Sequence, residues 1–439
     1  MKRGTTDRPG LDGHLWSPGR NAVWLVASGI FFISNSSYAE GFRNPPAGAF
    51  NLGRAGGRVA QVDDSSAAAQ NPANLVDLTG PEIQLAPSIV YISADFKSPT
   101  GQSAESQDNW KVLPNAFAAV PLGGGQFALG LAVTMPYGLD SRWDDGSSST
   151  FGRPFGAWRY QSPFSTELTT VNVSPAVGAR LGDFASVGFG LDIMWSRVQF
   201  KQFYPWFLLT GNLADPDGQI RAEGDGVGVG GNFGLTLDIT KRQRLAVTFR
   251  MPIRVDYSGN FQVDNVPAVL GGGSVQSDFD TSIKFPAIVA AGYGIELTDK
   301  IRIEADVEWL QFSNFKNLPL QTSNPLPGLP NSVNENWKDT FTAGIAGDWR
   351  FASNWIFRLG YQFYQSPVPD DTFSPAIPDA DQNVLTVGLA YNRGHHTLEG
   401  AYGADFYNSR HITNNQNPAF NGDYNITVHL FSFSYHYSF

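Results

Sequence analysis

The feature that most constrains the fold is an alternation of apolar and polar residues with period two, which recurs from about Pro81 to the last residue. In residues 245–257 every odd position is apolar, and polar or charged residues fill most of the even positions. The same pattern fills residues 301–309 and 355–363. Because successive side chains of a β-strand point to opposite faces of the sheet, the pattern predicts strands with one apolar and one polar face.

The predicted turns between these strands are ordered by length, with short and long connections in alternation. The short connections lie at about 123–126, 182–184, 240–243, 298–300, 352–354 and 393–395, and the long ones at about 97–111, 144–163, 204–221, 258–277, 317–337, 367–382 and 411–423. Six short and seven long connections join fourteen strands. Short periplasmic turns and long external loops are typical of bacterial outer-membrane proteins. The sequence therefore predicts an all-β fold, a 14-stranded antiparallel transmembrane β-barrel over residues 81–439, in the cell outer membrane of a Gram-negative-type bacterium.

Composition agrees with a membrane barrel and excludes several other classes. Only 16% of the 439 residues are charged, against about 25% in a typical soluble domain. The longest apolar run, residues 22–33, is shorter than the roughly 20 residues that a membrane-spanning helix needs. The net charge of −10 argues against nucleic acid as a partner, and the absence of cysteine excludes thiol catalysis and cysteine-ligated metals. We expect no cofactor and no metal ion.

Residues 1–39 are predicted to be a secretory signal peptide. Basic residues precede the apolar run 22–33, and the small residues Ser37 and Ala39 follow it at the spacing of a cleavage site. The mature chain is therefore expected to begin at Glu40.

The last strand supports the barrel independently. Its aromatic residues Phe431, Phe433, Tyr435, Tyr437 and Phe439 alternate with serine and histidine. A strand that ends on an aromatic residue is similar to the outer-membrane assembly signal, so the barrel-assembly machinery is an expected partner through Phe439. The apolar outer face requires outer-membrane lipid around the barrel.

Residues 40–80 are rich in Gly, Ala, Asn and Pro and show weak periodicity. They are too many for a linker and too few for a separate core, so we expect an N-terminal hatch, or plug, in the barrel lumen. Three blocks in this segment, 52–57 (LGRAGG), Asp63-Asp64-Ser65 and Asn71-Pro72-Ala73, resemble the hatch of the outer-membrane long-chain fatty-acid transporter family of the FadL/TodX type. Matches at 136–139, 366–369 and 377–381 extend the resemblance along the chain.

The resemblance implies a passive transporter that takes up hydrophobic molecules, namely long-chain fatty acids, with alkanes or monoaromatic hydrocarbons as the alternative. It implies that Phe42 lies by a lumen pocket. One family cation that holds the ligand head group is replaced here by Gln202, and the second matches Lys316. Lys316 is also an even number of residues from the preceding acidic positions that are expected to face the lumen. If the strand continued, its side chain would face the lumen too, and we expect it to hold a carboxylate.

Two further features suggest a route for the ligand. Trp206, Phe207 and Leu208 form an apolar stretch in a long loop, and a contiguous apolar patch outside the bilayer marks a binding site. Loops that pack on one another as a lid would explain the same stretch. The third predicted strand is interrupted by Pro136, Tyr137 and Gly138. Since proline cannot donate to a ladder, a kink there would open the wall sideways.

Other functions are weighed against transport. An outer-membrane acyl hydrolase would need His436 beside Ser434 or Ser438, but residues two apart on a strand are about 7 Å apart. A general porin would be blocked by a hatch, and a structural or adhesive barrel does not call for Asn71-Pro72-Ala73. The acidic loop residues Asp370, Asp371, Asp379 and Asp381 could bind Ca²⁺, but they lack EF-hand spacing and are interpreted as a solvated loop.

Overall fold

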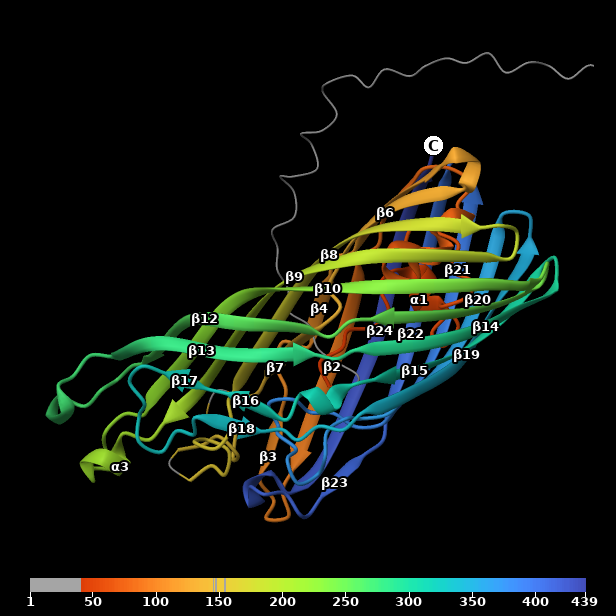
Figure 1. Cartoon of the computed structure of the whole chain (residues 1–439). Coiled ribbons are helices and arrows are strands. Elements are labelled where there is room, and N and C mark those ends of the chain that lie inside the picture. Colours follow the sequence, from red (N-terminus) through yellow and green to blue (C-terminus); the bar gives the residue numbers. More distant parts are fainter. Residues whose placement is uncertain (1–40, 145, 147, 154) are drawn as a thin grey trace, which may run out of the picture. The chain divides into compact units, whose positions relative to one another are not determined.

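The structure, a computed structural model, describes residues 41–144, 146, 148–153 and 155–439. The described residues form a closed antiparallel β-barrel of fourteen strands, as the sequence predicts (Figure 1). The predicted signal peptide, residues 1–39, lies outside the described residues. Among the residues that the structure describes, no helix is long and apolar enough to cross a membrane.

The fourteen strands of the wall include five that are interrupted once. In chain order they are β1 (Glu82–Leu85) with β2 (Ser88–Lys97), β4 (Trp110–Leu113) with β5 (Ala116–Leu122), β6 (Phe127–Thr134) with β7 (Gly138–Arg142), β8 (Ser165–Leu181), β9 (Ala185–Tyr204), β10 (Gly218–Thr240), β11 (Gln243–Arg250) with β12 (Ile253–Val263), β13 (Val275–Phe285) with β14 (Ile288–Thr298), β15 (Ile301–Leu310), β19 (Thr340–Ala352), β20 (Trp355–Tyr364), β21 (Gln382–Arg393), β22 (His396–Tyr407) and β24 (Gly422–Ser438). The long loops carry the short elements β3 (Ser103–Glu105), α3 (Phe207–Thr210), η3 (Ala268–Leu270), η4 (Phe312–Asn314), β16 (Asn317–Pro319), β17 (Gln321–Thr322), β18 (Ser332–Asn334), β23 (Arg410–Ile412) and η5 (Pro418–Phe420), and η2 (Gly123–Gly125) is a short turn.

The last strand closes the barrel. β24 pairs with β22 on one side and with both β1 and β2 on the other, in one continuous register from Glu82↔Ser438 to Lys97↔Asp423. Along β24 buried and exposed residues alternate, with Ser434 buried and Phe433 54% exposed. Because a closed barrel has no free edge, such outward apolar side chains can face lipid while every strand keeps its hydrogen bonds.

The seventh strand differs from the sequence prediction in one respect. The alternation over 245–257 predicts a single strand, but the structure has two, β11 and β12, separated by Met251 and Pro252. The register with β10 shifts by one residue between Asn232↔Arg250 and Asp225↔Ser258. Odd residues therefore face outward in β11 and inward in β12, because a proline at the break cannot continue the ladder.

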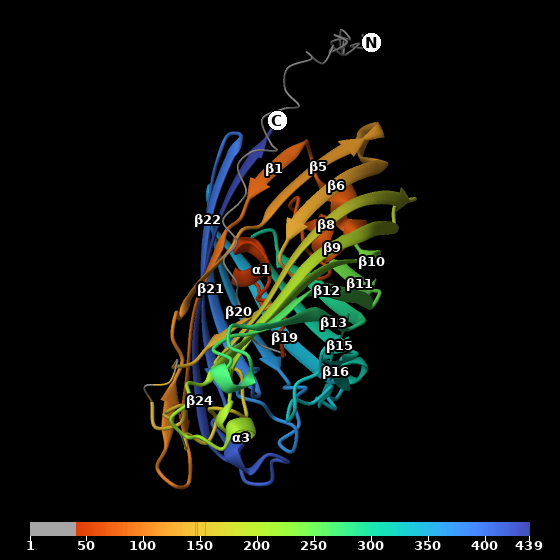
Figure 2. The same ribbon diagram turned by 90° about the vertical axis from the view of Figure 1, so that its left-hand side faces the viewer.

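Residues 41–80 lie inside the barrel (Figure 2). They contain α1 (Ala49–Gly53), which packs against β21, β22 and β24, α2 (Ala67–Gln70), and η1 (Pro72–Asp77), which packs against β8, β9 and β10. The close approach of η1 depends on glycines in the wall. A Cβ at Gly188 would lie 2.2 Å from the Pro72 carbonyl carbon, and one at Gly234 would lie 2.0 Å from Asn71 Oδ1. We call residues 41–80 the N-terminal segment.

Candidate transport site

The third strand is broken on one side. β6 pairs with β5 up to Ala116↔Val133, but among the described residues β7 has no ladder with β4, and backbone pairing resumes beside the bridge Ser106↔Trp143. The other neighbour, β8, pairs with both β6 and β7, with a shift of one residue across the break. From Gly138 to Ser141 the described residues therefore show no backbone hydrogen bond between β7 and β4, and the Arg142 carbonyl oxygen accepts from the Gln107 amide at 2.7 Å.

Burial shows which way the third strand bends. Outward residues of β6 are exposed, for example Leu129 at 46%, whereas four successive residues of β7, Gly138 to Ser141, are all buried. The strand thus turns into the barrel at residues 135–137, within the interruption that the sequence predicts. A salt bridge between Lys111 of β4 and Asp140 of β7 spans the break.

The N-terminal segment pairs with the edge that this bend exposes. The Asn44 amide donates to the Pro136 carbonyl oxygen at 3.0 Å, and the Gly138 amide donates to the Phe42 carbonyl oxygen at 2.8 Å. The Asn44 side chain donates a third bond, 2.8 Å long, to the Met135 carbonyl oxygen. These bonds satisfy strand groups that would otherwise be unpaired inside a membrane protein.

A cavity of about 130 Å³ lies beside the kink. Its apolar lining includes Leu52, Val59, Met135, Pro136, Ile288 and Leu430. Arg43 and Arg58 also line it, and both pair with Glu308 of β15, at 2.6 and 2.7 Å. The cavity thus offers an apolar surface with guanidinium groups at one side.

Phe42 is the centre of an aromatic cluster rather than a lining residue of this cavity. Its ring stacks on Trp337 with centroids 5.1 Å apart and makes edge contacts with Tyr137 and Phe285. Phe312 and Phe315 complete the cluster. The cluster joins the N-terminal segment to the kink of the third strand and to the long-loop half of the barrel.

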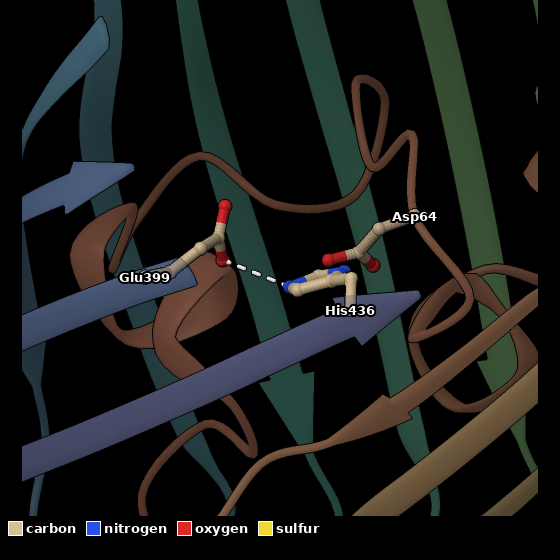
Figure 3. Close-up of side chains that lie close together, drawn as sticks. All are labelled: Asp64, Glu399 and His436. Carbon is tan, nitrogen blue, oxygen red and sulfur yellow. Dashed lines mark ion pairs between the residues drawn. The ribbon is translucent and has the colours of Figure 1, made fainter. Parts of the chain in front are cut away.

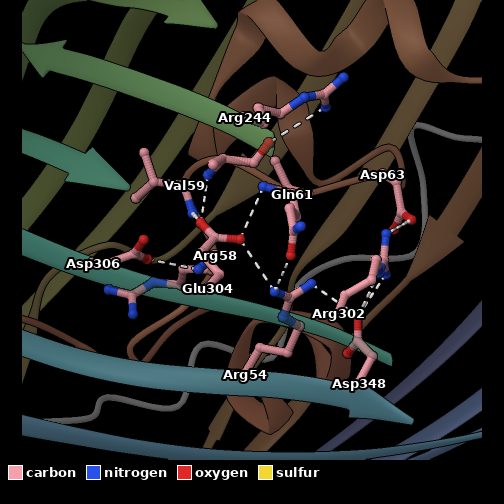
Figure 4. Close-up of polar contacts among 12 residues, drawn as sticks. Arg54, Arg58, Val59, Gln61, Asp63, Arg244, Arg302, Glu304, Asp306 and Asp348 are labelled. Carbon is pink, nitrogen blue, oxygen red and sulfur yellow. Dashed lines mark hydrogen bonds and ion pairs between the residues drawn. The ribbon is translucent and has the colours of Figure 1, made fainter. Parts of the chain in front are cut away.

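Buried ion pairs fix the N-terminal segment to the wall (Figure 4). Arg54 pairs with Glu304 of β15 at 3.1 Å and with Asp348 of β19 at 2.9 Å. Glu304 also accepts hydrogen bonds from the backbone amides of Val59 and Gln61, at 2.7 and 2.9 Å. A buried charge is tolerated only when it is paired and hydrogen-bonded, so the segment and the acidic strand positions depend on each other.

The Asn71-Pro72-Ala73 block forms the start of η1. The Asn71 side chain accepts from the Ala73 amide at 3.1 Å, which caps the helix, and it donates to the Thr236 hydroxyl of β10 at 3.0 Å. Pro72 occupies a first-turn position, where a missing N–H is not needed. Of the two predicted acidic residues, Asp63 pairs with Arg302 at 2.6 Å, and Asp64 faces β22 and β24.

The structure corrects the expected lumen phase of Lys316. β15 ends at Leu310 and η4 follows, so the strand periodicity does not reach residue 316. The Lys316 side chain is exposed in a long loop. Gln202, the other expected head-group position, donates to the Tyr160 carbonyl oxygen at 2.9 Å and so holds a loop.

The apolar loop stretch is only partly exposed. Trp206 is buried and donates to the Asp264 carbonyl oxygen at 2.9 Å, which ties the third long loop to the fourth. Its indole packs on Tyr204, so this residue belongs to the lid-like packing and not to a free surface. Phe207 is half-buried, and Leu208 is 70% exposed.

The interpretation of the acidic loop as solvated is wrong for Asp379. This carboxylate is buried and accepts from the Gly41 amide at 3.2 Å and from the Ser366 hydroxyl at 2.7 Å. Burial raises the pKa of the Asp379 carboxyl, although its hydrogen bonds act in the opposite direction. Sequence reasoning missed this anchor for Gly41 of the N-terminal segment.

Together, the closed fourteen-stranded wall and its exposed apolar outer side chains define an outer-membrane β-barrel. A family model described as "Outer membrane protein transport protein (OMPP1/FadL/TodX)" matches residues 30–439, so the chain belongs to this family. It is an outer-membrane transport protein for hydrophobic molecules and not an enzyme.

Relatives and solved structures agree with this assignment. The chain is 27% identical to the long-chain fatty acid transport protein of Salmonella typhi over 395 residues, which cover 83% of this chain and 87% of the relative. A FadL homologue from Pseudomonas aeruginosa has the same fold, with a TM-score of 0.77 and 20% identity over 91% of this chain and 100% of that one. The toluene transporter TbuX of Ralstonia pickettii gives a TM-score of 0.70 and 19% identity over 90% and 99% of the two chains.

Proposed function

We propose that the protein carries long-chain fatty acids from the external loops to the cavity beside the kink and releases them sideways through the break between the second and third strands. The observation that carries the proposal is the position of the cavity. Met135, Pro136 and Tyr137, which form the kink, also line the cavity, and β7 beyond them has no ladder with β4 in the described part of the chain. A backbone break at bilayer depth is tolerable only where it lines such a cavity.

Entry is proposed at the third and fourth long loops. Leu208 is 70% exposed and Val269 is 78% exposed, although both lie in loops that are tied together through Trp206. Apolar side chains left in water provide the contact surface for a hydrophobic ligand.

Passage along the barrel axis is less favourable than sideways release. The N-terminal segment would have to leave the wall, and this would separate Arg54 from Glu304 and Asp348. Loss of one partner of a buried ion pair costs about 3–5 kcal/mol. We therefore propose that this segment acts as a plug that stays in place during transport.

The proposed substrate is a fatty acid because its carboxylate can use cations that a hydrocarbon cannot. The guanidinium groups of Arg43 and Arg58 line the cavity, and such groups make strong charge-assisted hydrogen bonds with carboxylates. Lys316, whose side chain is exposed in a long loop, stays proposed to hold the carboxylate of the ligand. The relatives named as long-chain fatty acid transport proteins support this choice over a hydrocarbon.

The test is to replace residues 135–138 with a regular alternating strand segment and to measure oleate and toluene separately. Binding of oleate should survive while its uptake into vesicles or cells collapses, because the wall is then closed. Replacing the outward residues Leu129 and Leu131 of β6 by valine is the control on the same strand. Undiminished uptake by a folded, straightened barrel would contradict the sideways route, and uptake of toluene without binding of oleate would contradict the substrate.

A further inference from the structure

We propose that Asp64, Glu399 and His436 bind one divalent transition-metal ion of the zinc type, which joins the N-terminal segment to the barrel wall. Figure 3 shows the three side chains converging from three separate elements, the N-terminal segment, β22 and β24. One ligand atom from each, a carboxylate oxygen or an imidazole nitrogen, lies within 4.8 Å of the others. All three residues are more than nine-tenths buried.

Each of the three side chains keeps one buried atom that makes no hydrogen bond among the described residues: Asp64 Oδ2, Glu399 Oε2 and His436 Nε2. Two of these atoms, His436 Nε2 and Glu399 Oε2, lie 3.3 Å apart as an ion pair (Figure 3), whereas Asp64 Oδ2 has no partner in the part of the chain that the structure describes. A buried polar atom without a hydrogen bond costs about 1–3 kcal/mol, and this cluster contains three atoms without one. A metal ion would satisfy all three at once.

The opposite atom of each side chain is already held in place. Asp64 Oδ1 accepts from the Ser66 amide at 2.9 Å, and Glu399 Oε1 pairs with Arg358 at 2.9 Å. His436 Nδ1 lies 3.4 Å from a carboxylate oxygen of Glu82. A carboxylate on the far nitrogen of a metal-binding histidine fixes its tautomer and orientation, as in many zinc sites.

The charges and the donor types suit a transition metal. Three carboxylates, those of Asp64, Glu82 and Glu399, lie around the His436 imidazole, and Glu399 also pairs with the Arg358 guanidinium. One imidazole nitrogen with carboxylate oxygens is a donor set of catalytic-type zinc sites, whereas Ca²⁺ and Mg²⁺ take oxygen alone. Zinc bonds of about 2.0–2.2 Å require ligand atoms roughly 3.4 Å apart, so small side-chain rotations would close the site.

The position of the site gives the ion a structural role. Asp64 belongs to the segment inside the barrel, while Glu399 and His436 belong to strands beside the barrel closure. A bound ion would therefore hold the N-terminal segment at the seam where the last strand meets the first. It would complement the ion pairs of Arg54, which hold the segment on β15 and β19. This role does not depend on which molecule is transported.

The test uses the purified full-length barrel in detergent, stripped with a chelator and then titrated with Zn²⁺ alone. We expect one tightly bound zinc ion per chain by elemental analysis, and an unfolding temperature that rises on zinc addition because the ion binds the folded state. Asp64→Asn and His436→Gln should each abolish stoichiometric binding. Glu82→Gln, which removes the partner of His436 Nδ1, should weaken binding by about 10–100-fold.

His411→Gln is the matched control. His411 also pairs with a carboxylate, that of Asp423, but both side chains are exposed and His411 lies in the loop element β23. This variant should leave zinc binding unchanged. Heat-modifiable migration on gels verifies that each variant is folded, and Asp64→Asn keeps the test decisive if His436→Gln does not fold, because Asp64 lies outside the strands. Binding that is absent in the wild type, or unchanged in folded Asp64→Asn, would overturn the proposal and leave a shared proton as the explanation for the cluster.

Discussion

The third and seventh strands are both interrupted at a proline, but the pairing with the neighbouring strand differs between them. Each is interrupted at a proline, Pro136 or Pro252, and each shifts register by one residue against a neighbour. At the third strand the ladder with the preceding strand is lost, because β7 does not pair with β4 among the described residues. At the seventh strand the wall stays closed, because β12 lies directly on β10.

Glycines explain the closed case. A Cβ at Gly226 of β10 would lie 2.2 Å from the Asp256 carbonyl oxygen of β12, and one at Gly228 would lie 2.6 Å from the Arg254 carbonyl oxygen. Only strands without side chains at these positions can approach so closely. The third strand has no such surface to rest on, and the N-terminal segment supplies its hydrogen bonds instead, through Phe42 and Asn44. A proline kink therefore interrupts the pairing of a barrel wall only where the neighbouring strand does not follow it.

The largest loss of stability is expected when a contact that fixes the N-terminal segment to the barrel wall is removed. Glu304→Ala removes one of the two ion-pair partners of Arg54 and the acceptor for three backbone amides, so it should lower the free energy of unfolding by about 3–5 kcal/mol. The amide of Gly138 should exchange faster with solvent, whereas the Met251 amide, which donates to Gly231, should not. Ion conductance in planar bilayers should rise. Equal increases in the exchange rates of the two amides would show that the N-terminal segment does not support the third strand specifically.

The fold was predictable from sequence because alternation and loop length are local signals. The kink at Pro136 was found for the same reason, since proline acts on its own strand. The inverted face of β12 was not found, because residues 245–257 alternate without a fault and only the pairing with β10 reveals the shift.

The candidate site was less predictable, because its contacts join residues far apart in the chain. Arg54 is a charge in a largely apolar segment, and Glu304 is a charge on the lumen face of a strand. Because each needs a partner of opposite charge, the sequence could have suggested that they pair. The convergence of Asp64, Glu399 and His436 had no sequence signal, since it depends on the closure of the barrel. Lys316 was misplaced because strand periodicity was extended past the end of β15.

A smaller effect is expected from opening the closed kink. Gly226→Val forces a side chain against the backbone oxygen of Asp256 and should destabilise the barrel by about 1–3 kcal/mol, the usual range for overpacking. The displaced β12 should make the outer half of the seventh strand accessible to proteases. Gly400→Val is the control, because the nearest atom to a Cβ there is 4.0 Å away. If both variants unfold at the same denaturant concentration, close packing does not keep this kink shut.

The smallest effect is a pH dependence confined to the third-strand kink. Glu335 lies in a long loop and accepts from Trp337 Nε1 at 3.1 Å, and Trp337 stacks on Phe42, whose carbonyl oxygen accepts from Gly138. Burial raises the pKa of Glu335 from 4.5 to about 7, although the Trp337 bond lowers it slightly. Between these values the unfolded loop releases its proton before the folded loop does, so local stability falls as pH rises from 4.5 to about 7 and is constant above that. Hydrogen exchange at Gly138, corrected for the intrinsic rate, should therefore show less protection at pH 8 than at pH 5, while exchange at Met251 should show no such change. Glu335→Gln should remove the difference, and a pH dependence that persists in this variant would place its origin elsewhere.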